Sequence, residues 1–510
     1  MDHIEEFRED LRTFKEMTGK FYQKEISVND YKAFSGGFGS YAQRGGKESM
    51  LRLRLTGGEV SKEILTFIAK SIETHRISLT HLTTCQSIQF HNLSEGQVVS
   101  LMEDSFRHGI ITRGGGGDYP RNVMASPLSG VQKEEPFDVL PYAREAADYL
   151  LGFIHKVTLP RKLKVCFSNS GENEVHATFR DLGFVANQDQ TFDVYSAGGL
   201  GRSPRMGIKV ASHIPPEKTL YYIKAMIDTF VSYGNYQNRG RARTRFMPED
   251  MGEEAYRKAY EEKLNTALAE EDLELKISPS PVKKTGPVTD FTHPRVIPQK
   301  QTGLYAVCYK PPGGNPPPSL FQALSHALAS MEEVSIRITP DQGMYVINCT
   351  MEEAKTLLDL TKDSAKTSFE QSVACIGASI CQVGIRNSQA LLQACLEAVK
   401  KENFPDKVLP KIRISGCPSS CSAHQAGALS FSGRVRQTSE GPKNAFAIYE
   451  AGCGALGKEA FAQELGVMLE EEIPFFLIEL GRAVSRDHSV YDVWIQKHHE
   501  QFLDLVKKYI

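Results

Sequence analysis

The chain has 510 residues, too many for one hydrophobic core, and this length is typical of about two to four domains. Hydrophobic residues make up 41% and charged residues 24%, which is ordinary for a globular protein. The formal net charge of -2 excludes a global field that would attract nucleic acid or an anionic membrane, so any cationic site must be local.

The N-terminal segment MDHIEEFREDLRTFKEM is acidic and amphipathic, and it lacks the apolar core of a secretory signal. No uninterrupted apolar run approaches the roughly 18 residues that a transmembrane helix requires. We therefore expect a cytoplasmic protein with no membrane partner. In that reducing compartment, ten cysteines indicate metal binding or catalysis rather than a disulfide framework.

One pattern of strand, glycine turn, helix, strand and strand is predicted twice. It covers residues 49–93 and again residues 303–350, and LTTCQSIQF in the first copy matches ITPDQGMYV in the second. A single unit of this kind leaves one sheet face uncovered, so we expect two copies related by approximate two-fold symmetry. A tandem repeat that merely stacks is the alternative.

Between the copies, a proline-rich stretch predicts a linker over residues 279–300. Prolines forbid a regular helix or a central strand there, at positions Pro279, Pro281, Pro287, Pro294 and Pro298. Before the linker, PPEKTLYYIKAMIDTFVSYG predicts an amphipathic helix, and SQALLQACLEAVKKEN predicts another after the second copy. Cys395 falls on the apolar face of the latter helix, so we expect it in the core. The C-terminal DVWIQKHHEQFLDLVKKYI predicts a further amphipathic helix.

Basic residues stand in three segments where a plain scaffold does not need them. MLRLRL places Arg52 and Arg54 on one face of a strand, Arg121 follows a run of four glycines, and LPRKLKVCF places Lys162 and Lys164 on one side of a strand. Singly, each is typical of a solvated strand edge. Together they would form an anion pocket, because like cations are held close only when an anion compensates them.

A fourth basic cluster is NRGRARTRF, with four arginines in seven residues. RNA binding by so short a cluster is weakly indicated in a chain of net charge -2. A ligand with several carboxylates would suit it equally well.

Four cysteines form two pairs. Cys375 and Cys381 lie in ACIGASICQVG, and Cys417 and Cys421 lie in GCPSSCSAHQAG. Soft thiolates on two loops suit an iron–sulfur cluster or zinc, although a zinc site usually has closer spacing than the first pair. Unligated core cysteines remain a third interpretation.

The two cysteine segments, CIGASIC and SGCPSSC, resemble the cluster signature of the siroheme-dependent sulfite and nitrite reductases. The resemblance spans about residues 35 to 435 and includes the duplicated half-domain. It implies an α+β fold with duplicated ferredoxin-like half-domains plus two mixed α/β siroheme and Fe–S binding domains in pseudo-two-fold arrangement. The boundaries we expect are 1–47 (N-terminal helix and glycine-rich entry), 48–112 (first half-domain), 113–278 (first siroheme and substrate domain), 279–300 (linker), 301–366 (second half-domain), 367–482 (cluster and siroheme domain) and 483–510 (C-terminal helix).

The resemblance also implies roles for individual residues. The four cysteines would hold a [4Fe–4S] cluster, with Cys421 also binding the siroheme iron. The oxyanion would be bound by Arg52, Arg121, Lys162 and Lys164, and the siroheme carboxylates by Gln89, Arg239, Arg243 and Arg245.

Two positions depart from the family pattern. Where the family has TTRQ, with an arginine that contacts siroheme, this chain has TTCQ, which puts Cys85 there and that anchor in doubt. Ser419 replaces the asparagine that commonly follows the Cys-Pro, a change we expect to be tolerated.

The implied reaction is the six-electron reduction of a small anion. Lys164 favours sulfite, because nitrite enzymes often carry asparagine there, whereas CIGASIC is closer to the nitrite branch. No dinucleotide fingerprint is present in the right context, so electrons would come from a ferredoxin or a flavoprotein subunit.

Two other classes of function remain as alternatives. The four cysteines could serve a non-catalytic Fe–S or zinc protein. An enzyme of corrinoid synthesis is related to these reductases, but its chemistry does not need four cations around a small anion. The oligomeric state and the assimilatory or dissimilatory use of the enzyme do not follow from the sequence.

Overall fold

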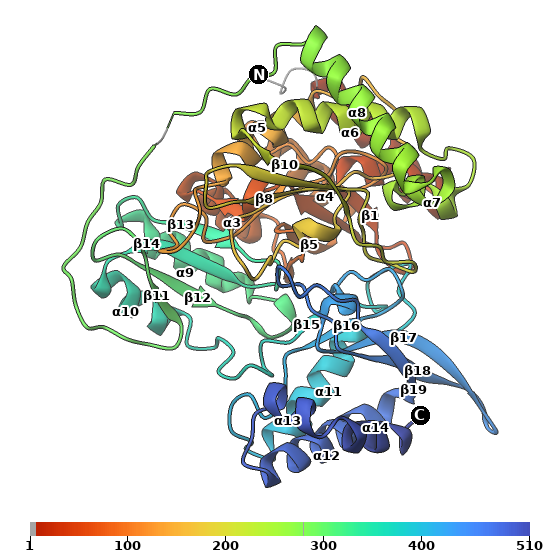
Figure 1. Cartoon of the computed structure of the whole chain (residues 1–510), viewed down its shortest axis with the longest axis vertical. Coiled ribbons are helices and arrows are strands. Elements are labelled where there is room, and N and C mark those ends of the chain that lie inside the picture. Colours follow the sequence, from red (N-terminus) through yellow and green to blue (C-terminus); the bar gives the residue numbers. More distant parts are fainter. Residues whose placement is uncertain (1–6, 279) are drawn as a thin grey trace. The chain divides into compact units, whose positions relative to one another are not determined.

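The computed structural model describes residues 7–278 and 280–510. Residues 1–6 and Pro279, which belong to the predicted N-terminal segment and linker, lie outside the described residues. The chain forms two compact units (Figure 1). Unit 1 comprises the described part of Met1–Gly199 with Arg205–Tyr309 and Pro316–Lys362, and unit 2 comprises Leu200–Pro204, Lys310–Asn315 and Asp363–Ile510.

Unit 1 opens with two helices, α1 (Arg8–Tyr22) and α2 (Val28–Ser35), which pack against each other. Two antiparallel sheets follow, with strand orders β1-β2-β5-β4 and β11-β12-β14-β13-β3. Their strands are β1 (Ser40–Ala42), β2 (Ser49–Leu53), β3 (Glu59–Val60), β4 (Leu79–Leu82), β5 (Ile88–Leu93), β11 (Val296–Pro298), β12 (Tyr305–Tyr309), β13 (Ser335–Ile338) and β14 (Met344–Cys349).

The duplication predicted from the sequence is confirmed, because β2-α3-β4-β5-α4 is repeated as β12-α9-β13-β14-α10. The helices are α3 (Lys62–Thr74), α4 (Glu95–Arg107), α9 (Pro318–Ala329) and α10 (Met351–Leu360). Gln86 and Gln342 occupy equivalent turns and both have positive φ, 54° and 63°. The helices α4 and α10 both begin at a capping box, at Ser94 and at Thr350.

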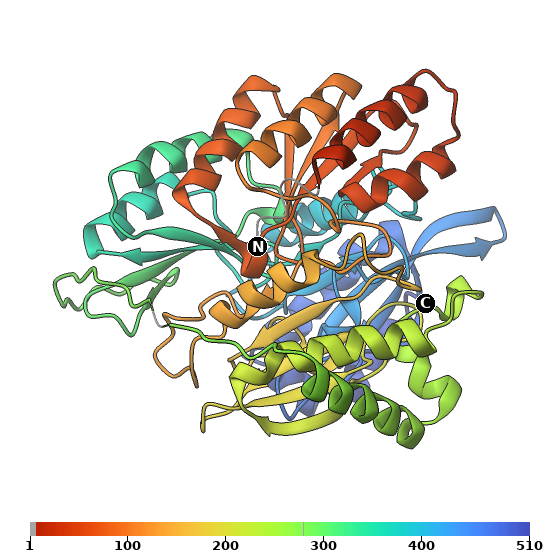
Figure 2. The same ribbon diagram turned by 90° about the horizontal axis from the view of Figure 1, so that it is seen from above.

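The two copies share one hydrophobic core rather than stacking as independent repeats. Strand β3 of the first copy pairs with β13 of the second, Val60 opposite Ile336. Helix α3 packs against α9 (Figure 2). The hydroxyl groups of Thr66 and Ser325 lie 3.4 Å apart.

A mixed sheet in unit 1 has the order β10-β9-β8-β7-β6, in which β6, β7 and β8 are parallel and the rest antiparallel. The elements are β6 (Met124–Ala125), α5 (Leu140–Leu151), β7 (Val165–Ser168), η3 (Ala177–Phe179), β8 (Leu182–Ala186), β9 (Phe192–Ser196), β10 (Ile208–Ile214), α6 (Thr219–Tyr233), α7 (Met247–Met251) and α8 (Glu253–Glu270). The amphipathic helix predicted before the linker is α6.

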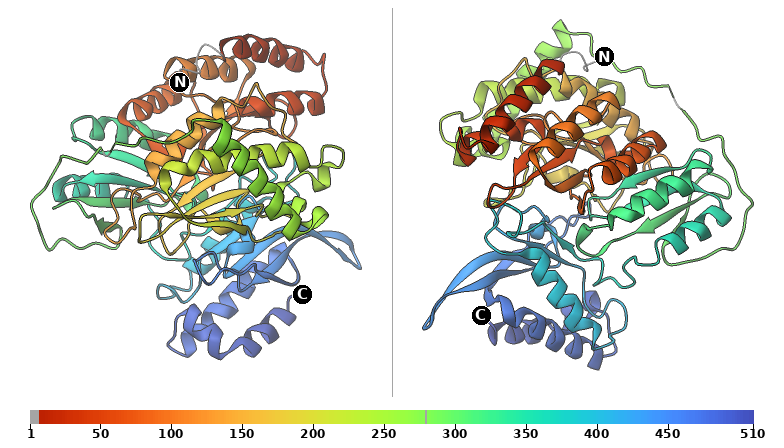
Figure 3. Two further views of the ribbon diagram at one scale, coloured as in Figure 1. Left: turned by 45° about the horizontal axis from the view of Figure 1, so that its top comes forward. Right: turned by 180° about the vertical axis from the view of Figure 1, so that it is seen from behind.

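Unit 2 repeats this topology. Its sheet has the order β15-β16-β17-β18-β19, again with the first three strands parallel. The long strands β17 and β18 appear in blue in Figure 3. The elements are β15 (Val373–Ala374), α11 (Ser388–Lys400), β16 (Ile412–Ser415), η8 (His424–Ala426), β17 (Leu429–Thr438), β18 (Gly441–Glu450), β19 (Gln463–Leu469), α12 (Ile473–Arg486), α13 (Tyr491–Lys497) and α14 (His499–Lys507).

Two segments differ from the sequence-based expectation. Strand β11 forms within the predicted linker, where it occupies a sheet edge, the position that tolerates Pro298. The prediction of a single C-terminal helix is wrong. The backbone leaves helical geometry at His498, so this segment forms two helices, α13 and α14. Trp494 and Phe502 on either side of the break are both buried in the core of unit 2, so both pieces dock on the body.

Among the helices that the structure describes, none combines the length and the apolar character needed to cross a bilayer.

Candidate functional site

In unit 1, a glycine-rich loop over residues 113–121 contains one of the predicted arginines, Arg121, and forms a hydrogen bond with another, Arg52. Arg52 on β2 donates from Nη1 to the Gly115 carbonyl oxygen at 2.5 Å, and Arg121 donates from Nη2 to the same oxygen at 3.0 Å. The glycines allow this loop to approach a neighbouring chain segment closely. A Cβ on Gly116 would lie 2.2 Å from the Gly36 carbonyl oxygen.

The predicted lysines are brought beside Arg121 by a short parallel bridge between Pro120 and Leu163. The Arg121 amide donates to the Leu163 carbonyl oxygen at 2.9 Å. Lys162 and Lys164 flank Leu163 in sequence, and both are half-buried. The structure therefore gathers Arg52, Arg121 and the lysine-bearing strand in one region of unit 1.

Arg54 has a different role from the anion ligand that its spacing suggests. It is buried, and its guanidinium donates to the carbonyl oxygens of Arg113, Pro120 and Arg121 at 3.1, 3.3 and 3.2 Å. Burial, with the charge of Arg121, lowers the pKa of Arg54 to about 9. Arg54 thus stabilises the loop that carries Arg121, a role that sequence reasoning missed.

Gln89 lies opposite Arg52 on the neighbouring strand β5. With its amide oriented to satisfy both groups, the Gln89 oxygen accepts hydrogen bonds from Arg52 Nη2 at 2.5 Å and Nε at 3.1 Å. Gln89 therefore orients the Arg52 guanidinium.

The sequence difference at Cys85 falls within this cationic region. Lys164 Nζ lies 3.4 Å from Cys85 Sγ. Burial alone would raise the pKa of this thiol, but the charges of Lys164, Arg180, Arg52 and Arg121 outweigh it and lower the pKa to about 6. At neutral pH Cys85 is therefore mainly a thiolate.

Asp181 is a fully buried anchor that sequence reasoning also missed. Its carboxylate accepts from the Lys164 backbone amide at 2.9 Å and from Arg243 Nη2 at 3.0 Å, and also from the Thr244 hydroxyl. The signal in the sequence was an acidic residue directly before an apolar strand in RDLGFVA. Asp181 joins the lysine strand to the arginine-rich segment.

The arginine-rich segment divides into buried and exposed members. Arg245 is buried, and its Nε and Nη1, like Arg243 Nε, have no hydrogen-bond acceptor among the described residues. Burial and the charge of Arg243 lower the pKa of Arg245 to about 10. Arg239 instead lies at the surface, 68% exposed, where it forms an ion pair with Asp118 at 2.7 Å.

The cysteines of unit 2 follow two adjacent parallel strands. Cys375 follows β15, and Cys417 follows β16 after Gly416. The Gly416 amide donates to Cys375 Sγ at 3.1 Å, and the Ser388 hydroxyl lies 3.1 Å from the same sulfur. Burial, together with the nearby Cys417, raises the pKa of Cys375.

The second member of each cysteine pair lies on the loop beyond. The Cys381 amide donates to the Gly377 carbonyl oxygen at 2.8 Å, and Gly377 has the positive φ, 78°, that a glycine adopts without strain. Cys421 is exposed. Within residues 7–278 and 280–510, no three His, Cys, Asp or Glu side chains are gathered closely enough to hold a metal ion.

The remaining cysteines are mostly packing residues. Cys395 is fully buried on α11, as predicted. Cys166 and Cys349 are also buried, and burial raises the pKa of Cys166 to about 12. Cys308 and Cys453 are half-buried.

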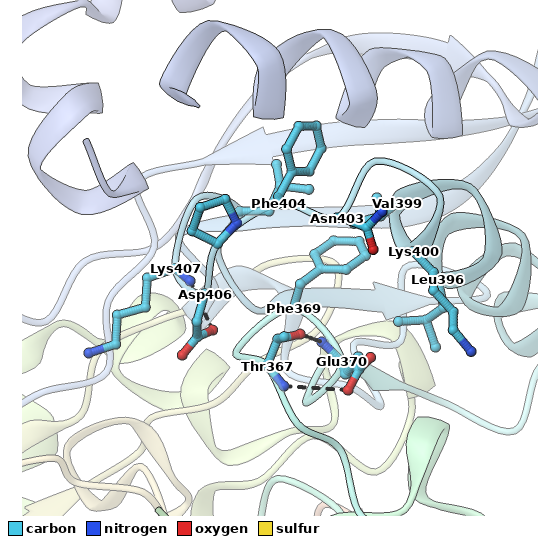
Figure 4. A pocket seen from close by; sticks show the side chains of 12 residues that line it. Thr367, Phe369, Glu370, Leu396, Val399, Lys400, Asn403, Phe404, Asp406 and Lys407 are labelled. Atoms are coloured by element: carbon cyan, nitrogen blue, oxygen red, sulfur yellow. Dashed lines mark hydrogen bonds between the residues drawn. The ribbon is translucent and has the colours of Figure 1, made fainter. Parts of the chain in front are cut away.

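A small cavity of about 160 Å³ lies beside α11 in unit 2 (Figure 4). None of the four paired cysteines lines it. The carboxylates of Glu370 and Asp406 at its wall already accept backbone amide hydrogen bonds, from Lys366 and Ser368. The cavity is therefore not a candidate active site.

Comparison with known families gives two matches. Residues 41–104 match the nitrite/sulfite reductase ferredoxin-like half domain, and residues 116–268 match the nitrite and sulphite reductase 4Fe-4S domain. Apart from residues 200–204, both matched segments lie in unit 1, and the four paired cysteines lie outside them.

Curated relatives include both kinds of reductase. The chain is 24% identical over 467 residues to a chloroplastic ferredoxin–nitrite reductase of Arabidopsis thaliana, covering 86% of this chain and 77% of that one. It is also 24% identical over 402 residues to a sulfite reductase [ferredoxin] of Mycobacterium tuberculosis, covering 76% and 70%.

Among solved structures, the fold matches the Mycobacterium tuberculosis NirA protein. The TM-score is 0.78 at 22% identity, over 96% of this chain and 94% of that one.

Proposed function

The chain belongs to the nitrite and sulphite reductase family, and from this premise we propose that it reduces sulfite to sulfide by six electrons. The family makes it an oxidoreductase whose cofactors are siroheme and a [4Fe–4S] cluster. The choice of anion and the roles of individual residues are the proposal.

The residues present suit both cofactors chemically. Arg243 and Arg245 bring buried guanidinium N–H groups without acceptors, and such groups are costly unless an anion such as a siroheme carboxylate accepts from them. In unit 2 the thiols supply soft ligands, and the Gly416 amide already donates to Cys375 Sγ as it would to a cluster ligand. We assign the cluster to Cys375, Cys381, Cys417 and Cys421, with Cys421 shared with siroheme.

When bound, the two cofactors supply electrons and the iron at which the anion is reduced. The protein's own side chains would contribute electrostatically. Arg52, Arg121, Lys162 and Lys164 would bind the oxyanion, stabilise the charge that develops as each oxygen leaves and pass protons to it. Gln89 and Arg54 hold the two arginines in place through the hydrogen bonds described above.

The observation that supports sulfite is the retention of two lysines beside two arginines in unit 1. Sulfite carries more charge and more oxygen atoms than nitrite, so a second ammonium group at Lys164 suits it better. Nitrite is the second candidate, and Cys85 favours it, because a thiolate at 3.4 Å offsets part of the Lys164 charge.

The electron donor is proposed to be a ferredoxin, with a flavoprotein subunit as the alternative. The names of the curated relatives include ferredoxin in both the nitrite and the sulfite reductases. The absence of a dinucleotide fingerprint in the sequence is consistent with an external donor.

The test is a side-by-side assay on protein purified without oxygen. We expect siroheme absorption bands and consumption of sulfite with a reduced viologen donor. Reduction of nitrite with sulfite inert would overturn the choice of sulfite in favour of the second candidate.

A further inference from the structure

Cys85 is an anionic side chain among the cations that lower its pKa, and none of the roles proposed above uses it. It stands in the turn between β4 and β5, two residues beyond Thr83, whose hydroxyl accepts the Cys85 amide at 3.3 Å. The Cys85 carbonyl oxygen accepts from the buried Asn122 amide at 3.0 Å. The thiol is therefore held at a fixed place beside Lys164.

The charged neighbours come from several elements. Cys85 is affected by Lys164, Arg180, Arg52 and Arg121, while Lys164 is affected by Cys85, Arg180, Arg243 and Arg121. Cys166, protonated, and Asp181 complete the set; Asp181 accepts from the Lys164 amide and is already paired with Arg243. Every other cation in this list repels the Lys164 ammonium.

The balance at Lys164 depends on the thiolate. Cys85 raises the pKa of Lys164, but burial and the charges of Arg180, Arg243 and Arg121 outweigh it, so the pKa lies below its ordinary value. Removing the thiolate leaves only influences that favour the neutral amine.

We propose that Cys85 is a positioning residue that acts as the counter-ion of Lys164, keeping that ammonium charged among guanidinium groups and thereby setting the pH range over which the site holds its anion. The proposal rests on the proposed function only in identifying that anion with the substrate. The thiolate–ammonium pair itself does not depend on which anion is reduced.

The pairing of Cys85 with Lys164 should affect anion affinity in two opposite ways. The thiolate repels an incoming anion, yet it keeps Lys164 charged at higher pH. A neutral residue in place of Cys85 should therefore strengthen anion binding just above the Cys85 pKa, where the wild-type thiol is ionised and Lys164 is still charged, and weaken it at higher pH, where Lys164 of the variant becomes neutral. The two pH profiles should cross, which mere loss of packing would not produce.

The first experiment measures the thiol directly in the intact holoenzyme. Iodoacetamide labels Cys85, and the labelled peptide is quantified by mass spectrometry across pH. We expect the labelling midpoint near pH 6 and an upward shift of about one unit or more in Lys164→Met. Lys156→Met, at an exposed lysine, is the control and should leave the midpoint in place. A labelling midpoint at the pKa of an ordinary thiol, or a midpoint that is unchanged in Lys164→Met, would overturn the proposed pairing of Cys85 with Lys164.

The second experiment measures sulfite binding to the oxidised holoenzyme by calorimetry at several pH values. Cys85→Ser should bind sulfite more tightly than wild type just above the Cys85 pKa of about 6 and lose about tenfold affinity for each pH unit above the lowered Lys164 pKa. Cys85→Asp restores a negative charge and should return the profile towards wild type. Parallel profiles for all three proteins would contradict the counter-ion role.

The two proposals fail separately. If Cys85 titrates near pH 6 and responds to Lys164 while sulfite is not reduced, the pair stands and the proposed substrate falls. If sulfite is reduced and the thiol is ordinary, the proposed function stands and this inference falls.

Discussion

The guanidinium of Arg54 donates to the carbonyl oxygen of Arg121 at 3.2 Å, so one arginine of the strand end fixes the backbone of another. The Arg121 guanidinium in turn donates to the carbonyl oxygens of Gly117 and Gly115 at 3.1 and 3.0 Å, so its side chain is positioned by the same glycine-rich loop. Arg52 and Arg54 are alike in the sequence but differ in their contacts: Arg54 donates to three loop carbonyl oxygens, whereas Arg52 donates to Gly115 and is the one that we propose binds the anion.

Replacement of Arg54 by methionine should disorder the loop around Arg121. Two buried carbonyl oxygens and one part-buried carbonyl oxygen would lose this donor, and we expect a loss of about 2–4 kcal/mol in unfolding free energy together with weaker anion binding. Chemical denaturation and calorimetry with sulfite measure the two effects. Arg12→Met, at a side chain 80% exposed, is the control and should change stability by less than about 0.5 kcal/mol. Equal effects of the two substitutions would contradict the role of Arg54.

Lys164→Asn should shift preference towards nitrite. It removes one ammonium from the set that binds the more highly charged anion, and we expect the ratio of kcat/KM for sulfite to that for nitrite to fall about tenfold or more. The exposed Lys156→Asn is the matched control. An unchanged ratio would refute the charge argument for sulfite.

Cys375→Ala should abolish cluster binding, whereas Cys395→Ala should not. Cys375 receives an amide hydrogen bond beside Cys417, while Cys395 is a packing residue in the core of unit 2. Iron and acid-labile sulfide content separate the two variants, and Cys395→Ala should lose only about 1 kcal/mol of stability. Full iron content in Cys375→Ala would remove that residue from the ligand set.

Acidification should destabilise the fold through His91. Burial, with the charges of His81 and Arg52, lowers the pKa of His91 to about 3, so the folded state keeps it neutral. The unfolded chain binds that proton below about pH 6.5, and stability is therefore lost progressively as pH falls from about 6.5 towards 3. At about pH 4.5 the loss amounts to roughly 2–3 kcal/mol.

The check is denaturant unfolding between about pH 7 and pH 4.5 in wild type and in His91→Gln. Glutamine has no proton to gain, so the variant should lose less stability over this interval, even though its hydrogen bond to Gln43 differs. His326→Gln, at an exposed histidine, is the control and should keep the wild-type slope. A His91→Gln slope equal to wild type would show that His91 does not carry this dependence.

The elements with local signals were predictable. The two copies around LTTCQSIQF and ITPDQGMYV carry their own hydrophobic alternation, and Cys395 falls on a clear helical face. The cations at Arg52 and Arg121 were predicted to converge, and the Gly115 carbonyl oxygen receives both.

The residue roles that the sequence did not predict depend on contacts between residues far apart in the chain. Asp181 acquires its role only when β8 lies beside the lysine strand, and Arg54 only when the loop folds over the end of β2. Arg239 has the same local pattern as Arg245, yet the surface ion pair with Asp118 engages it. Its proposed contact with siroheme remains a prediction.

The pairing of β3 with β13 bears on how this protein is made. Glu59 and Val60 leave the ribosome long before Arg337 and Ile336, their partners in the ladder, have been synthesised. Until then a short strand edge of the first copy stays unpaired, the kind of edge at which nascent chains associate wrongly. The Glu59 carboxylate, which Arg144 and Arg337 bind in the folded protein, places a negative charge on that edge. This charge disfavours pairing of the edge with other nascent chains.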